Sequence, residues 1–64
     1  MVKVNGKQTD SDGKSIAMLI ESEGYDKTRV AVELNMEIVP KARYIETILK
    51  DGDSVEIVGF VGGG

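Results

Sequence analysis

The chain ends in GFVGGG, and the three terminal glycines, residues 62–64, are the part of the sequence whose chemistry stands out. Because glycine has no Cβ atom, a glycine tail can thread a channel that is too narrow for any other residue. The tail also ends in an unhindered carboxylate, which a partner enzyme could activate, for example as an acyl-adenylate, for attack by sulfur or nitrogen. The alternative is an inert spacer with no role in function.

The side chains that build most catalytic and metal sites are missing. The chain contains no His and no Cys, so a Ser/His/Asp or Cys/His nucleophilic site cannot be assembled and a structural zinc site is not expected. The sequence DSDG, residues 10–13, resembles part of a calcium loop, but the further acidic ligands are not at the required spacing. We therefore predict turns at DSDG and at Asp51-Gly52-Asp53, no metal, no cofactor, and no enzyme activity of the protein on its own.

Length and charge narrow the class of protein. Sixty-four residues form one small domain, with a formal net charge of −3 and eight scattered basic residues. Nucleic-acid binding needs a concentrated basic face, so we expect no nucleic-acid partner. No apolar run approaches the ~20 residues that span a bilayer, and no secretory signal is evident, so we expect a cytoplasmic protein without a membrane partner. The acidity suits either a basic protein partner or ordinary solubility.

The beginning of the chain predicts a β-hairpin. In the sequence MVKVNGKQT, two valines alternate with a lysine and are followed by Asn5-Gly6. Both of these turn residues tolerate the positive φ that a two-residue hairpin turn requires. We expect strands at about residues 1–5 and 8–10.

An amphipathic helix is expected next. The apolar residues at helical spacing are Ile16, Leu19 and Ile20. Met18 lies off this face and should be exposed. Ser15 is the expected N-cap, with Asp12 as the alternative, and Gly24 stands where a glycine commonly ends a helix.

In the second half of the chain, apolar and polar residues alternate as they do in β-strands. Residues 29–34 predict a strand, residues 35–40 a tight turn and a short strand, and residues 55–60 the final strand, with one helical turn from Pro40 between them. This order is β-β-α-β-β-β, an α+β layout with a helix on one side of a sheet. The expected core consists of Ile16, Leu19, Ile20, Val30, Val32, Val55 and Ile57, with Ile45, Ile48 and Leu49 beneath the connecting segment.

Two stretches, VAVELNMEIVP and LKDGDSVEIVGFVGGG, resemble the ThiS family, the bacterial sulfur carriers of thiamine biosynthesis. The resemblance covers essentially the whole chain and rests on the LN.EIVP hairpin, the DGD turn and the terminal Gly-Gly. It implies a ubiquitin-like β-grasp fold, with one main helix on a mixed sheet of four or five strands. It also implies a β-grasp domain at residues 1–60 and a flexible glycine tail at residues 61–64.

The resemblance implies a carrier function. In that family a ubiquitin-activating-like adenylyltransferase adenylates the terminal glycine, and sulfur from a cysteine-desulfurase donor then replaces AMP. The resulting thiocarboxylate donates sulfur to thiazole synthase for thiazole formation. Carried over to this chain, the resemblance makes Gly64 the modified residue, Gly62 and Gly63 the threading part of the tail, and Val58, Phe60 and Val61 part of the partner-binding surface.

One departure from the family pattern and two alternative functions stay open. The family usually has glycine where this chain has Met36, so the turn either takes another form or holds Met36 in a strained conformation. A sulfur carrier for molybdopterin, tRNA or cysteine thiolation would share the fold and the Gly-Gly end, although the LN.EIVP hairpin and the short length favour thiamine. The other alternative is a ubiquitin-like interaction module with an inert tail.

Overall fold

The computed structural model describes residues 1–59. The described residues form five strands, one α-helix and two 3₁₀ helices. In chain order these are β1 (Val2–Val4), β2 (Lys7–Thr9), α1 (Ile16–Ser22), η1 (Lys27–Arg29), β3 (Val30–Leu34), β4 (Glu37–Val39), η2 (Lys41–Arg43) and β5 (Ser54–Gly59). The last strand was expected to reach Phe60, which lies outside the described residues.

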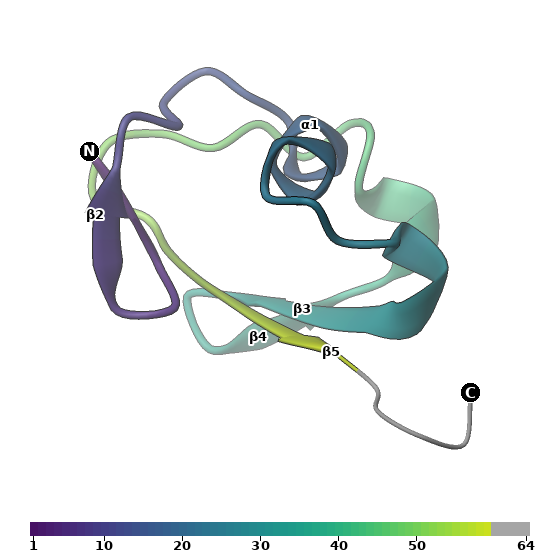
Figure 1. Ribbon diagram of the computed structural model, residues 1–64. Helices are drawn as coiled ribbons and strands as arrows, with labels where there is room; N and C mark the ends of the chain where they lie inside the picture. Colours follow the sequence, from purple (N-terminus) through teal and green to yellow (C-terminus); the bar gives the residue numbers. More distant parts are fainter. Residues whose placement is uncertain (60–64) are drawn as a thin grey trace.

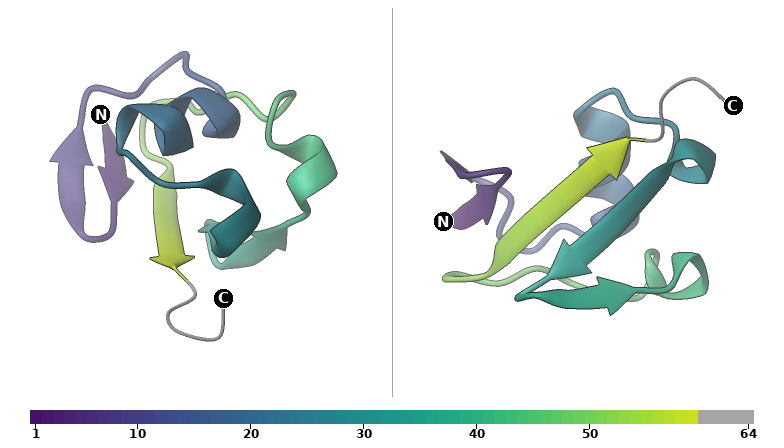
Figure 2. Two further views of the ribbon diagram at one scale, coloured as in Figure 1. Left: turned by 45° about the vertical axis from the view of Figure 1, so that its right-hand side comes forward. Right: turned by 90° about the horizontal axis from the view of Figure 1, so that it is seen from below.

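The strands form one mixed sheet in the order β2-β1-β5-β3-β4. β1 and β5 pair in parallel, whereas the other neighbouring strands pair antiparallel. Helix α1 covers one face of this sheet (Figure 1), and the view from below shows β5 between β1 and β3 (Figure 2). The expected α+β fold, with one main helix on a mixed sheet of four or five strands, is confirmed, and the arrangement is that of a β-grasp.

Local capping fixes both ends of α1. Ser15 is the N-cap, as expected, and not Asp12, because the Ser15 Oγ accepts a hydrogen bond from the Met18 N–H at 3.1 Å. Met18 itself is 55% exposed, as its position off the apolar face predicted. At the other end Gly24 has a φ of +82°, and the N–H of the following residue bonds back to the Ile20 carbonyl at 3.0 Å.

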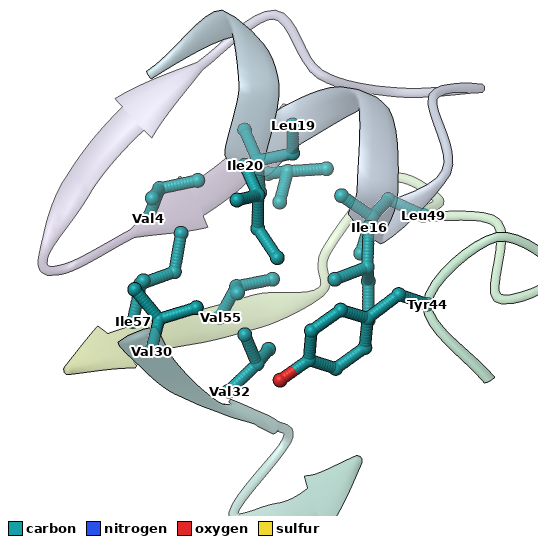
Figure 3. Close-up of a cluster of buried hydrophobic side chains, with 11 residues drawn as sticks. Val4, Ile16, Leu19, Ile20, Val30, Val32, Tyr44, Leu49, Val55 and Ile57 are labelled. Atoms are coloured by element: carbon teal, nitrogen blue, oxygen red, sulfur yellow. The ribbon is translucent and has the colours of Figure 1, made fainter. Parts of the chain in front are cut away.

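One hydrophobic core lies between α1 and the sheet (Figure 3). All seven residues expected in the core are buried there, so that prediction is confirmed. The core consists of Val2, Val4, Ile16, Leu19, Ile20, Val30, Val32, Tyr44, Leu49, Val55 and Ile57. The Tyr44 side chain points toward Val32 (Figure 3), and burial raises the pKa of its hydroxyl, an effect that a backbone hydrogen bond with Val32 opposes.

The expectation that Ile45 and Ile48 would be core residues is wrong, whereas Leu49 is buried as expected. Ile45 is 77% exposed and Ile48 is 56% exposed. The reason is that the backbone of this segment bonds to the start of α1: the Tyr44 and Thr47 carbonyls accept from the first two N–H groups of the helix, both at 3.0 Å. With the segment held in this way, Tyr44 and Leu49 take the inward positions, and the two isoleucines are left outside.

Two hairpin turns with the same backbone conformation carry different second residues. Asn5 and Gly6 have φ values of 50° and 83°, and Asn35 and Met36 have φ values of 51° and 71°. Positive φ at both central residues is the type I′ turn that suits the twist of a two-residue hairpin. The open question is thereby answered: the turn is of the usual type, and Met36 adopts a left-handed conformation that non-glycine residues rarely adopt.

Met36→Gly is therefore expected to leave the denaturation midpoint unchanged or to raise it. A left-handed conformation costs a non-glycine residue ~1–2 kcal/mol, whereas the greater freedom of glycine in the unfolded chain costs ~0.5–1 kcal/mol. The control is Ile38→Gly on the adjoining strand, where φ is not positive. There the added freedom of the unfolded chain can only lower the stability of the protein. Urea denaturation of both variants makes the measurement, and a loss of ~1 kcal/mol or more for Met36→Gly would show that methionine is unstrained there.

Candidate functional site

Strand β5 is the last described element of the chain and directly precedes residues 60–64 in the sequence. It is held on both sides, by β1 and by β3, and its last residue, Gly59, pairs with Val30. A tail that starts at the end of a central strand starts from a fixed position. The predicted site residues Phe60, Val61, Gly62, Gly63 and Gly64 lie outside the described residues, so their roles stay predictions.

Alternate residues of four strands point to the sheet face that α1 does not cover, which we name the outer face: Lys3, Ala31, Glu33, Ile38, Glu56 and Val58. Val58, the one predicted partner-binding residue in the described part of the chain, is 56% exposed there, while its neighbour Ile57 is buried. Ile38, which is 76% exposed on the same face, was missed. The sequence contained the information needed to place Ile38. Successive side chains of a strand point to opposite faces, so an inward Val39 requires the preceding residue to point outward.

Two carboxylates oppose each other on this face. Glu33 of β3 and Glu56 of β5 are direct partners in the antiparallel register, a position in which side chains lie close together and like charges destabilise the pair. With Met36 and Ser54 they border a hollow of about 260 Å³. The outer face is thus apolar at Ile38 and Val58 and acidic between them.

A larger hollow of about 570 Å³ lies on the helix side of the molecule. The exposed isoleucines 45 and 48 and the exposed Met18 of α1 contribute apolar surface to it. Its lining comprises Ser15, Ala17, Met18, Ile20, Glu21, Tyr25, Asp26, Lys27, Ile45 and Ile48. Val58, the one predicted partner-binding residue within residues 1–59, does not contribute to this lining.

The LN and DGD motifs meet in space and have a structural role. The Asn35 side chain donates to Asp53 Oδ1 at 3.0 Å and accepts from the Ser54 N–H at 2.9 Å. The Asn35 N–H donates to the Ser54 carbonyl at 2.7 Å. Asp53, which is only 6% exposed, also accepts from the Lys50 N–H at 3.0 Å. These bonds join the β3–β4 turn to the start of β5, so the motifs position the strand that carries the tail.

The first hairpin is joined to β5 by a second asparagine. The Asn5 N–H donates to the Val55 carbonyl at 2.9 Å, and the Asn5 Oδ1 accepts from the Ile57 N–H at 2.7 Å. An asparagine at the first turn position can extend the ladder in this way because its side-chain amide resembles a peptide group. Both hairpins thus fix β5 through side chains as well as through strand pairing.

The acidic sequences DSDG and DGD contain turns, as predicted. Within residues 1–59 there is no group of three or more Asp, Glu, His or Cys side chains that could hold a metal ion. Nor does that part of the chain contain a helix long and apolar enough to cross a membrane.

Comparison with known proteins agrees with the fold and the motifs described above. The ThiS family model matches residues 2–64. The chain is similar to a sulfur carrier protein ThiS of Bacillus subtilis, with 44% identity over 66 residues that cover all of both chains. It is also 44% identical over 62 residues to a thiazole synthase of Paramagnetospirillum magneticum. That match covers 95% of this chain but only 19% of the relative, so the chain spans about a fifth of that protein's length.

The fold has a solved counterpart. The crystal structure of a thiamine biosynthesis protein (ThiS) from Geobacter metallireducens superposes with a TM-score of 0.79 at 34% identity, covering 98% of this chain and 97% of that one. A family match over nearly the whole chain, a full-length relative and a structure of the same fold all indicate one assignment. The chain belongs to the ThiS family, the small sulfur carrier proteins of thiamine biosynthesis, which are carriers and not enzymes.

Proposed function

We propose that Gly64 is the residue on which this protein carries sulfur, as a C-terminal thiocarboxylate. The observation that carries the proposal is the position of β5, a central strand held on both sides that leads directly into a tail ending in three glycines. A fixed base and a tail without side chains suit delivery of a carboxylate into a narrow active site.

The chemistry requires two partners before the sulfur is delivered. A ubiquitin-activating-like adenylyltransferase joins the Gly64 carboxylate to the α-phosphate of ATP and releases pyrophosphate. A persulfide whose sulfur comes from a cysteine desulfurase attacks the acyl-adenylate carbon, AMP leaves, and an acyl disulfide forms. A thiol then reduces this disulfide and releases the thiocarboxylate. ATP and a thiol reductant are both available in the cytoplasm, where the proposal places the reaction.

Thiazole synthase is the proposed acceptor of the sulfur. Support comes from the Paramagnetospirillum magneticum relative, a protein named thiazole synthase that contains a stretch similar to this chain. A carrier that must bind several enzymes in turn benefits from a folded domain that docks on each enzyme and a tail that extends into its active site. We propose that residues 1–60 dock through Val58 and Phe60, and that Val61, the first residue of the tail, extends this contact. Docking then raises the effective concentration of residues 61–64 at the active site.

Intact-mass measurement tests the proposal. The full chain is incubated with the adenylyltransferase of the thiamine pathway, ATP, cysteine, a cysteine desulfurase and a thiol. The mass is expected to rise by the difference between sulfur and oxygen, and fragmentation is expected to place the change on Gly64. Omission of ATP is the control and should leave the mass unchanged. An unchanged mass with all components present, although the adenylyltransferase modifies a known ThiS protein in parallel, would contradict the proposal and favour the inert-tail alternative.

A further inference from the structure

The opposed carboxylates of the outer face have no partner that neutralises them within residues 1–59. The ion pairs of the described chain involve neither Glu33 nor Glu56, and residues 60–64 contain no basic side chain. Lys3 lies on the same face beside Ser54, yet it forms no ion pair with either glutamate in the described structure. In the free protein this arrangement is unfavourable, because directly opposed like charges weaken a strand pair.

The surroundings of the pair suit a long cationic side chain. The hollow of about 260 Å³ that they border is completed by Met36 and Ser54. Met36 is 91% exposed and itself adopts a left-handed turn conformation, with a φ of 71°. An alkyl stem can pack on the methionine while a planar guanidinium donates to both carboxylates, which a compact ammonium group does less well.

The reach of the tail limits where a partner can bind. Five residues, 60–64, span at most about 18 Å when fully extended. A protein that binds Gly64 must therefore come close to the end of β5. A standard interface covers about 800 Å² per partner, or about 30 Å across. Glu56 is three residues from Gly59, about 10 Å along the strand. Ser54, which borders the hollow together with Met36, is five residues from Gly59, about 17 Å along the strand. An interface about 30 Å across that begins at the end of β5 and extends over the outer face therefore covers the two glutamates and reaches Met36.

We propose that the outer face docks the adenylyltransferase, and that an arginine of that enzyme inserts between Glu33 and Glu56 with its alkyl stem against Met36. The inference rests on the proposed function, because the strand that carries Glu56 also carries the tail. Ile38 and Val58 supply the apolar surface beside the ion pair. The charge repulsion in the free carrier is relieved in the complex, so residues that weaken the fold strengthen the docking.

The test is binding of the full chain to the purified adenylyltransferase of the thiamine pathway, without ATP, measured by calorimetry at low and at high salt. Glu33→Gln and Glu56→Gln are each expected to weaken binding about tenfold, and higher salt is expected to reduce this difference. Both variants should also raise the thermal midpoint of the free carrier. Met36→Gly should weaken binding without lowering that midpoint.

Glu21→Gln is the matched control, since it makes the same change on α1 beside the helix-side hollow. It is expected to leave binding within about twofold, because it removes no charge from the docking face. Unaltered binding by both outer-face variants would overturn the inference, and so would an equal loss with Glu21→Gln or a loss seen only with thiazole synthase. Absence of binding by the unaltered chain overturns it too. The ATP-dependent mass change is a separate readout, so failure of the proposed function is recognised independently.

Discussion

Removal of Gly62, Gly63 and Gly64 is expected to abolish thiocarboxylate formation while the domain stays folded. The shortened tail would end at Val61, whose branched side chain cannot follow a path that glycine can. It would also reach about 10 Å less far from β5. The described core lies between Val2 and Ile57, so the deletion removes no side chain from it. Intact mass after incubation with the adenylyltransferase, ATP and the sulfur source measures the result.

Deletion of a single glycine is the matched control. The chain then still ends in Gly-Gly, and its reach falls by only about 3.5 Å. We expect sulfur transfer to be slowed and not abolished, and far-UV circular dichroism to be the same for both truncated proteins. Sulfur loading of the chain that ends at Val61 would show that the glycines are not needed and would remove the basis for the carrier assignment of Gly64.

Leu19→Ala is expected to unfold most of the protein. Leu19 is fully buried at the centre of α1 and contacts the core formed with the sheet. Truncation of a buried leucine costs ~2–5 kcal/mol. A domain of this size without disulfides or metals rarely has more than ~3–5 kcal/mol of stability in total. The loss is therefore comparable to the whole free energy of unfolding, which urea denaturation followed by circular dichroism can determine.

Met18→Ala on the same helix is the control for Leu19→Ala. Met18 is 55% exposed and outside the core, so its truncation should change the free energy of unfolding by no more than ~0.5 kcal/mol. Equal denaturation midpoints for the two variants would mean that α1 does not pack on the sheet as described. That result would count against the fold itself.

The elements that short stretches of sequence specify could be predicted. The Asn5-Gly6 turn identifies its hairpin because few residues accept positive φ, and the Ser15 cap with its apolar face identifies the helix. The connection after Pro40 was harder, because it has no periodicity. There the contacts with the start of α1 decide which side chains are buried, so Ile45 and Ile48 were placed incorrectly. No local pattern carries that information.

The candidate site also contains one feature that the sequence could predict and one that it could not. The glycine tail is a chemical signal that stands in a single stretch of sequence, so its role could be proposed without a structure. The opposition of Glu33 and Glu56 could not, because it depends on the register between strands that are separated by 19 residues, from Leu34 to Ser54. A shift of one residue in that register would turn one of the two side chains to the other face of the sheet.

The attachment of β5 has a mechanical consequence. In the proposed function an enzyme draws residues 61–64 into its active site, and the resulting pull is transmitted along β5. The strand is bonded to β1 on one side and to β3 on the other, and Asn5 and Asn35 add side-chain bonds to it. A pull along the strand axis must therefore shear many bonds at once, whereas peeling would break them one at a time. The carrier can thus be held by its tail under tension, with the load borne by the centre of the sheet.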